Sequence, residues 1–241
     1  MKTKAKALQL LLLLLTSVGM VNSALADMED VKKAFDSSTS IAVYSKPDGA
    51  VTFDARPASD RFGFNSQPSF AQSENAPLPE EYAGLEALVL KQLKEQLPDY
   101  PFVSQKVADL PQKKSFGIST PDWSGTAHET LIEVSMIVKY TGFPGNGDKM
   151  TYSLEGDVIL IMDHKNAKGK FKKLKPNAMG TYSLGRVTEQ ISFDGKTSVP
   201  VKNLDQLLEA MPPIRILEKL ESKVAEGVLQ FTTELTATDQ E

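Results

Sequence analysis

The sequence "MDHKNAKGKFKKLKP", residues 162–176, combines a histidine, a carboxylate and a dense run of cations. His164 follows Asp163, and six lysines with no acidic residue occupy positions 165–175, called here the lysine stretch. These residue types fit three roles: metal ligation by the histidine and the carboxylate, attraction of an anionic partner, or protection of an exposed hairpin by charge. For each role, the rest of the chain would have to place different residues around this segment.

The lysine stretch is a basic region in an otherwise acidic chain. The sequence contains 27 basic and 31 acidic residues, which gives a formal net charge of −4 at pH 7. If an N-terminal segment that contains Lys2, Lys4 and Lys6 is removed, the charge becomes −7, and the residues outside the lysine stretch then carry −13. Such a distribution steers anionic partners toward the lysines. Lysines also keep an edge hairpin from pairing with other chains, and this simpler role stays open.

We predict that the lysine stretch contacts an anionic surface or an acidic partner, such as lipid headgroups, lipopolysaccharide phosphates or an acidic envelope protein. The predicted contact residues are Lys165, Lys168, Lys170, Lys172 and Lys173. Each lysine close to an anionic membrane contributes about 1 kcal/mol of attraction. Nucleic acid is not expected as a partner, because the rest of the chain is acidic and the sequence has only four arginines.

Aromatic residues in two polar segments form a second predicted contact surface. Phe62, Phe64 and Phe70 lie within residues 57–78, which are dominated by Pro, Ser, Asn and Gln, and the only tryptophan, Trp123, lies in another loop-like segment. A long segment without regular structure is typical of a functional or a disordered loop. We expect these aromatic side chains either to cover the sheet or to present apolar groups to a partner.

The two histidines give little support to a metal site. His128 precedes Glu129 and His164 follows Asp163, but adjacent residues of a strand point to opposite faces, so neither pair chelates an ion by itself. A zinc site would need the fold to bring both histidines and a carboxylate together. We therefore predict no metal and no cofactor. We also expect the neighbouring lysines to disfavour protonation of His164.

A hydrolase that uses His128 or His164 is the competing hypothesis. Ser124 lies close to His128 in sequence, and Asp122 or Asp163 would supply the carboxylate of a triad. The sequence has no G-x-S-x-G motif. "GFPGNGDK" matches neither a phosphate-binding loop nor a dinucleotide fingerprint. The hypothesis requires a histidine nitrogen within hydrogen-bonding distance of a serine hydroxyl or a second carboxylate, inside a pocket.

The N-terminus indicates an exported protein. Residues 1–26 show a lysine-containing start, a short apolar run from Leu8 to Leu15 and the small-x-small sequence Ala24-Leu25-Ala26, as in a bacterial secretory signal peptide cleaved before Asp27. The apolar run is short for a membrane span of about 20 residues. The chain has no cysteine, which excludes disulfides, a thiol nucleophile and a lipidated cysteine. We expect a periplasmic or secreted protein without a transmembrane segment after cleavage.

The N-terminal half contains signals for a hairpin and a helix. "SIAVYSKPDGAVTFDA" places two β-branched and aromatic runs on either side of Lys46-Pro47-Asp48-Gly49, which predicts a β-hairpin. Residues 79–97 carry apolar side chains at helical spacing between Pro79 and Pro98, which predicts a helix with a buried stripe. "YPFVSQKV" predicts a short strand, followed by a loop that reaches His128.

The C-terminal half predicts an antiparallel meander and a second long helix. Apolar and polar residues alternate over 130–140 and again over 150–162, so both segments are expected to bury one face. One or two further strands follow the lysine stretch. Asn203 is expected to cap a short helix that ends at Pro212, and residues 213–235 predict a long helix with Pro213 at its first position. Its expected apolar stripe is Ile214, Leu217, Leu220, Val224, Val228, Phe231 and Leu235.

Together these signals predict one α+β domain over residues 27–241: an antiparallel β-meander of about five to six strands with two main helices packed on one face. With no catalytic motif, the favoured function is a non-catalytic binding or accessory protein of the bacterial envelope. A third hypothesis is a carrier that holds a lipid or another hydrophobe between the sheet and the helices, which requires an apolar pocket of a few hundred Å³ there.

Overall fold

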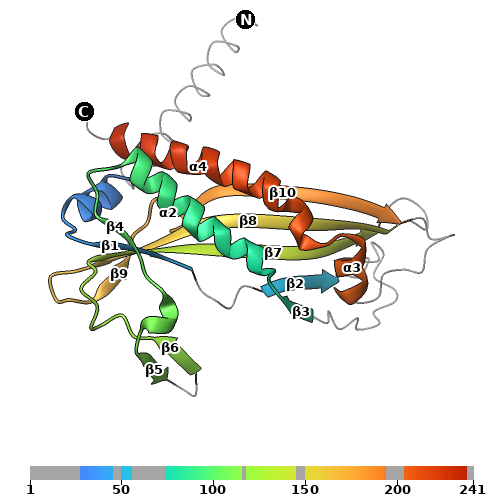
Figure 1. Ribbon diagram of the computed structural model, residues 1–241, viewed down its shortest axis with the longest axis horizontal. Helices are drawn as coiled ribbons and strands as arrows, with labels where there is room; N and C mark the ends of the chain where they lie inside the picture. Colours follow the sequence, from blue (N-terminus) through green and yellow to red (C-terminus); the bar gives the residue numbers. More distant parts are fainter. Residues whose placement is uncertain are drawn as a thin grey trace, which may run out of the picture.

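The computed structural model describes residues 28–45, 50–55, 74–115, 118–144, 150–193 and 204–237. The predicted signal peptide and the predicted contact residues Phe62, Phe64 and Phe70 lie outside the described residues. Within them the chain has mixed α+β structure, in which a curled sheet is covered on one face by helices, as Figure 1 shows.

The described elements follow the predicted order for most of the chain. The strands are β1 (Ile41–Tyr44), β2 (Ala50–Ala55), β3 (Glu74–Pro77), β4 (Phe102–Ser104), β5 (Gln112–Ser115), β6 (Ile118–Pro121), β7 (Thr130–Pro144), β8 (Met150–Lys165), β9 (Phe171–Lys173) and β10 (Tyr182–Phe193). The helical elements are residues 28–36, η1 (Glu80–Ala83), α2 (Gly84–Gln96), η2 (Val107–Asp109), α3 (Leu204–Ala210), η3 (Pro213–Ile216) and α4 (Leu217–Ala237).

The predicted meander exists at the centre of the sheet. Strand β7 pairs antiparallel with β8 along its whole length, and β8 pairs antiparallel with β10 and, at its end, with β9. The predicted buried face is confirmed, since Ile132, Val134 and Val138 of β7 and Leu154 and Leu160 of β8 are buried. Strict alternation over these two long segments was therefore a reliable signal.

The predicted hairpin across Lys46–Gly49 is wrong, and so is a purely antiparallel sheet. Strands β1 and β2 both run parallel to β7, with Ile41 opposite Thr130 and Val51 opposite Val138. They therefore follow each other along one edge of β7 instead of pairing with each other. Strand β1 also pairs in parallel with β4, and α2 lies in the connection between them, as parallel pairing requires. The turn residues 46–49 themselves lie outside the described residues.

Two strand pairs occur in segments that were predicted as loops. Strand β3, from the end of the predicted 57–78 loop, pairs antiparallel with β2. Strands β5 and β6 form a separate two-stranded sheet within the predicted loop before His128. Sequences such as Glu74–Pro77 lack the β-branched and aromatic residues that mark a strand, so they form strands only because a partner edge is available.

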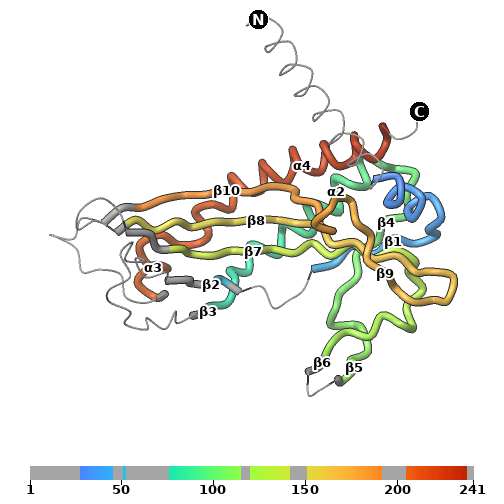
Figure 2. Tube along the Cα trace, turned by 180° about the vertical axis from the view of Figure 1, so that it is seen from behind, coloured from blue at the N-terminus to red at the C-terminus, as the bar shows by residue number. Residues whose placement is uncertain are grey.

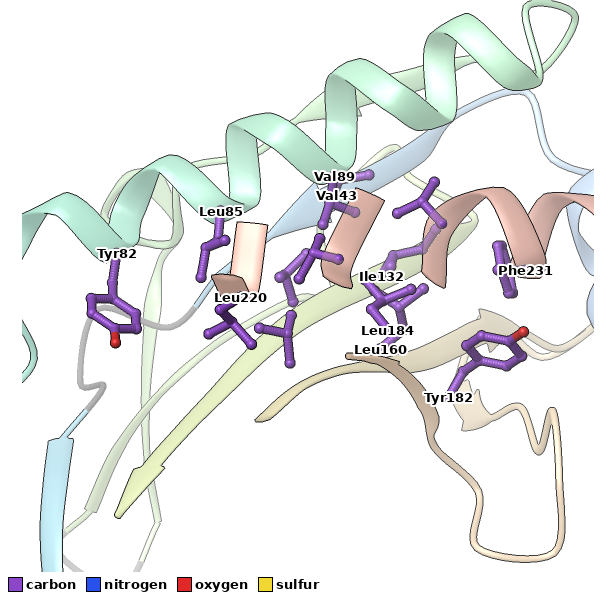
Figure 3. Packing of buried hydrophobic residues seen from close by; sticks show 14 of the residues in the cluster. Val43, Tyr82, Leu85, Val89, Ile132, Leu160, Tyr182, Leu184, Leu220 and Phe231 are labelled. Atoms are coloured by element: carbon purple, nitrogen blue, oxygen red, sulfur yellow. The ribbon is translucent and has the colours of Figure 1, made fainter. Parts of the chain in front are cut away.

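The helices α2 and α4 lie side by side over one face of the sheet, and their apolar stripes form the core (Figures 1 and 2). Figure 3 shows Leu85 and Val89 of α2 and Leu220 and Phe231 of α4 among the buried side chains of the strands. Ile214 is an exception to the predicted stripe, because it is 43% exposed and Ile216 is buried instead. Residues 213–216 form a 3-10 helix with about three residues per turn, which shifts the buried position. None of the described helices combines the length and apolarity needed to cross a bilayer.

A smaller apolar cluster covers the opposite face of the sheet near β1. Ala42, Tyr44 and Leu131 are buried there, and Trp123 and Phe171 pack against them. These residues belong to β1, β7, β9 and the loop before His128. This cluster fixes the base of the β8–β9 hairpin to the rest of the sheet.

Candidate anionic contact site

The lysine stretch forms an ordered hairpin between β8 and β9. Lys165 pairs with Phe171 and Asp163 with Lys173 in an antiparallel ladder. The turn is held by Asn166, whose backbone N–H donates to the carbonyl of Lys170 at 2.9 Å, while its side-chain oxygen accepts the N–H groups of Lys168 and Lys170. Gly169 has φ +70°, a left-handed conformation that glycine adopts without strain.

Four of the predicted contact lysines, Lys168, Lys170, Lys172 and Lys173, are exposed on this hairpin. Because Lys172 and Lys173 are consecutive strand residues, they point to opposite faces of the ribbon. Among the described residues, none of the four ammonium groups forms an ion pair with a carboxylate. Their charges are therefore not neutralised by described neighbours.

Lys165 has a different environment from the other four lysines. Its side chain is half-buried, and its ammonium group donates a hydrogen bond to the carbonyl of Thr126 at 2.5 Å. The ammonium nitrogen also lies 5.2 Å from the ring centroid of Phe171. A cation over an aromatic face is attracted to the ring electrons. Lys165 therefore anchors the base of the hairpin, and the other four lysines remain available to a partner.

Lysines in other parts of the described structure either form ion pairs with carboxylates or are more widely spaced than the hairpin lysines. On the helices and the main sheet, Lys32 pairs with Asp36, Lys139 with Glu155, and Lys219 with Glu189. A second group of exposed lysines also lacks an ion-pair partner among the described residues, and its members are Lys94, Lys106, Lys113 and Lys114. These four lie on three different segments, whereas residues 164–188 contain six lysines and no acidic residue.

Both histidines lie at the base of the hairpin, where a ladder of side-chain hydrogen bonds joins two segments. Residues 38–40 face residues 130–128 in reverse order, which ties the segment after the first helix to the start of β7. The three contacts are Ser38 Oγ to Thr130 Oγ1 at 2.7 Å, Thr39 Oγ1 to Glu129 Oε2 at 2.9 Å, and Ser40 Oγ to His128 Nδ1 at 2.8 Å. Ser40 of this ladder contacts the His128 ring, and Thr130 of the ladder contacts the His164 ring at 2.8 Å.

The bonds around His128 define its tautomer. Gln105 donates through Nε2 to the carbonyl of Lys106, so its Oε1 is the acceptor that faces His128 Nε2 at 3.1 Å. His128 therefore carries its proton on Nε2, and its Nδ1 accepts the hydroxyl proton of Ser40. Burial lowers the pKa of His128, and the ammonium of Lys165 lowers this pKa further.

His164 has the opposite tautomer. The Ser38 hydroxyl donates to the carbonyl of Ala34 at 2.7 Å, so Thr130 donates to Ser38 and His164 Nδ1–H donates to Thr130 Oγ1 at 2.8 Å. Burial lowers the pKa of His164, and the charge of Glu129 opposes this shift. The expected direction was right, but the expected cause was wrong, because burial and not the lysines produces it.

The remaining predicted site residues are not brought together. Trp123 is half-buried, with its ring centroid 4.6 Å from that of Tyr44, so part of its surface packs on the sheet. Ser124, the serine predicted to accompany His128, is exposed, and Ser40 takes its place beside the histidine. In the part of the chain that the structure describes, no three acidic or histidine side chains gather closely enough to hold a metal ion.

Two described cavities lie at the margins of the helical layer. One, of about 460 Å³, lies where the helix over residues 28–36 meets the ends of α2 and α4, and its lining includes Asp36, Tyr100 and Thr236. The other, of about 310 Å³, lies between the same helix and the base of the hairpin, beside His164 and Leu174. Neither separates the sheet from α2 and α4, so they provide no site of the kind that the carrier hypothesis requires.

Met179 is an exposed residue near the hairpin that the sequence did not single out. It is 82% exposed, the largest exposed fraction among the exposed large apolar side chains of the described residues. It lies in the turn that follows β9, between Asn177 and Gly180. An apolar residue inside the turn sequence "PNAMG" was the available signal, and it carried no pattern that would distinguish it from an ordinary loop residue.

No family model and no curated protein matches this sequence. Among solved structures, the hypothetical protein CT253 from Chlamydia trachomatis matches over 82% of this chain and 98% of its own, with 9% sequence identity and a TM-score of 0.23. A TM-score at that level supports no inference about fold or function.

Proposed function

We propose that this protein is an exported, non-catalytic binding or accessory protein of the bacterial envelope that contacts an anionic surface or an acidic partner through the β8–β9 hairpin. One observation carries the proposal. Lys168, Lys170, Lys172 and Lys173 are exposed, lack ion-pair partners among the described residues, and belong to a segment without any acidic residue. Unpaired ammonium groups at high local density create the positive field that attracts an anionic partner.

The ordered base of the hairpin strengthens this proposal. Lys165, Phe171 and the Asn166 turn hold the ribbon in one conformation, so a partner does not have to order it on binding. Binding to a preorganised surface avoids part of the entropy cost of association. The lysines therefore present their charges at fixed backbone positions.

Export is the second part of the proposal and rests on the sequence of residues 1–26. The predicted cleavage site precedes Asp27, and the core includes Met28, Val31 and Phe35. Cleavage at that site would leave these core residues in the mature chain. N-terminal sequencing of the protein exported by a bacterial host should begin at Asp27, and an uncleaved N-terminus would contradict this part.

The hairpin contact is tested by sedimentation of the mature protein with isolated bacterial envelope membranes. The test variant changes Lys168, Lys170, Lys172 and Lys173 to glutamate. The matched control changes Lys94, Lys106, Lys113 and Lys114 to glutamate, which alters the net charge by the same amount at other exposed sites. We expect salt-sensitive binding of the wild type and the control, and a loss of binding of at least about ten-fold in the hairpin variant.

Two outcomes would contradict the contact. Equal losses in both variants would mean that overall charge, and not the hairpin, determines binding. Unchanged binding of the hairpin variant would leave the lysines with the simpler role of keeping an edge ribbon from pairing with other chains.

A hydrolase is a second candidate because Ser40 Oγ lies 2.8 Å from His128 Nδ1. This contact meets the hydrogen-bond requirement of the sequence hypothesis with a serine that the sequence did not indicate. Two features argue against Ser40 and His128 as a catalytic pair. Gln105, not a carboxylate, orients the ring, and the nearby Lys165 disfavours the imidazolium that a general base must become.

The hydrolase candidate is tested with a fluorophosphonate probe, which reacts with activated serine hydroxyl groups. We expect no labelling of the wild type. Labelling that disappears in Ser40→Ala and in His128→Gln would establish an activated serine and overturn the non-catalytic proposal. The cavities described above do not include Ser40 or His128 in their linings, which favours the expected result.

A further inference from the structure

The turn that carries Met179 lies against the lysines of the hairpin. A side chain built on Gly180 would have its Cβ 3.5 Å from Lys173 Cε, 3.8 Å from Lys173 Nζ and 3.8 Å from Lys175 Cγ. The aliphatic stems of these two lysines therefore line the turn, and Met179 is the neighbour of Gly180 in that turn. The most exposed large apolar side chain that the structure describes is thus next to the most lysine-rich segment.

The turn is built to hold Met179 outward. The side chain of Asn177 accepts the N–H of Met179 at 2.9 Å and donates to the carbonyl of Thr181 at 2.5 Å. The N–H of Gly180 donates to the carbonyl of Asn177 at 2.9 Å, and Gly180 has φ +70°. These bonds fix the backbone on both sides of the methionine. Its exposure is therefore a property of an ordered turn.

We propose, building on the proposed hairpin contact, that the partner is the surface of an anionic lipid bilayer, and that Met179 enters the boundary between its headgroups and acyl chains beside Lys173 and Lys175. A single protruding apolar residue beside two lysines matches a fluid interface, which needs no complementary pocket. A protein partner is favoured less, because lysine is depleted from the centres of protein–protein interfaces and such interfaces bury several apolar side chains together.

The charge of the rest of the chain orients this contact. Apart from the lysine stretch, the mature chain carries −13, so an anionic bilayer repels most of the surface and attracts the hairpin. Binding to a membrane surface strengthens with the electrostatic attraction to anionic lipids and with the apolar area that is buried, and these are two separate signals. Met179 supplies the second signal that the lysines alone lack.

The experiment uses the mature chain with vesicles of phosphatidylglycerol and phosphatidylcholine, and with vesicles of phosphatidylcholine alone. We expect cosedimentation only with the anionic vesicles. Met179→Ser should weaken binding to the anionic vesicles about ten-fold, because the variant no longer buries a large apolar side chain in the bilayer. The matched control is Leu229→Ser, since Leu229 is 53% exposed on α4 and is not part of the hairpin. The control should bind like the wild type.

Because the chain has no cysteine, a single introduced thiol can report insertion directly. An environment-sensitive fluorophore on Met179→Cys should shift its emission to the blue with anionic vesicles, and the same label on Leu229→Cys should not. Equal shifts at both positions, or bound protein without a shift at position 179, would overturn the insertion of Met179.

Different outcomes would contradict the lipid partner and the hairpin contact. Lysine-dependent binding to envelope membranes without binding to anionic vesicles would overturn the lipid partner and leave the hairpin contact in place. Loss of that binding after protease treatment of the membranes would assign it to an acidic protein. If the hairpin variant binds envelope membranes and anionic vesicles as well as the wild type does, both proposals fail.

Discussion

Helix α4 approaches β10 through a glycine, whereas the β8–β9 hairpin meets solvent through lysines. At Gly227 an added Cβ would lie 1.8 Å from the carbonyl oxygen of Leu184, so the helix touches the backbone of the strand. The side chains of Lys168 and Lys170 in the hairpin turn are exposed and make no described ion pair. The two regions belong to the same fold, but one has no spare volume and the other is surrounded by solvent.

Because of this difference, we expect substitutions in the two regions to affect different properties, stability in one and partner binding in the other. Substitutions between α4 and β10 should change the free energy of unfolding, because packed interiors do not accommodate extra atoms. Substitutions of the exposed hairpin lysines should leave that free energy nearly unchanged. A loss of partner binding caused by such hairpin substitutions can therefore be interpreted as loss of a contact and not as unfolding.

The largest effect is expected for Gly227→Ala. The new methyl group would collide with the backbone of Leu184, which cannot move aside as a flexible side chain does, so we expect destabilisation of about 3 kcal/mol or more. Gly84→Ala is the matched control, because no atom lies within 4 Å of its added Cβ and its φ is −60°. It should be neutral or stabilising by up to about 1 kcal/mol. Urea denaturation measures both, and equal values would contradict the close approach.

A second large effect is expected for Phe231→Ala. The Phe231 ring is fully buried, with its centroid 5.0 Å from that of Tyr182, and its removal leaves a cavity that should cost about 3–5 kcal/mol. Met179→Ser, at an apolar residue beside the hairpin, should change the free energy of unfolding by less than about 0.5 kcal/mol. A large cost at Met179 would show that this residue packs against the protein, and would remove the contrast between the regions.

The sequence predicted the buried faces of the periodic segments but not the pairing of the shorter strands. In β7, β8, α2 and α4, periodic apolar residues pack against one continuous core, and their predicted buried faces are confirmed. The parallel pairing of β1 and β2 with β7 depends on which strand edge is free, and that information is absent from the local pattern around Lys46–Gly49. Strand β3 was missed for the same reason, because its pairing partner and not its composition makes it a strand.

At the candidate site, too, local sequence patterns were predictable and contacts between distant residues were not. Charge density alone located the lysine stretch, because a run of cations without acidic neighbours is visible in one sequence. The separate role of Lys165 depends on Thr126 and Phe171, and the Ser40–His128 contact joins residues 88 positions apart. Met179 was not singled out, because its exposure and its position near Lys173 are established only by the fold.

A moderate effect of pH is expected from the histidine ladder at the base of the hairpin. Burial lowers the pKa values of His128 and His164, so the unfolded chain binds protons near pH 6.5 more readily than the folded chain does. The stabilising contribution is therefore complete above the unfolded pKa and is lost as the pH falls from about 6.5 toward the lower folded values. Urea denaturation at several pH values should show this loss. A variant with His128→Gln and His164→Asn should show a weaker dependence over this range, and an unchanged dependence would assign it to other groups.

Only a small effect on stability is expected for the hairpin variant with Lys168, Lys170, Lys172 and Lys173 changed to glutamate. Because these side chains are exposed and have no described ion-pair partners, we expect a change in the free energy of unfolding of less than about 1 kcal/mol. Thermal or urea denaturation should give similar results for this variant and for the control with Lys94, Lys106, Lys113 and Lys114 changed. A large loss in the hairpin variant alone would mean that the lysines support the fold.

Lysine footprinting of the wild-type protein on bacterial envelope membranes tests the hairpin contact most directly, because it requires no substitution. Acetylation of each lysine is measured by mass spectrometry with the protein free and with the protein bound. The account predicts protection of Lys168, Lys170, Lys172 and Lys173 on binding, with unchanged reactivity at Lys94, Lys106, Lys113 and Lys114. Protection of the second group with a fully reactive hairpin would contradict it.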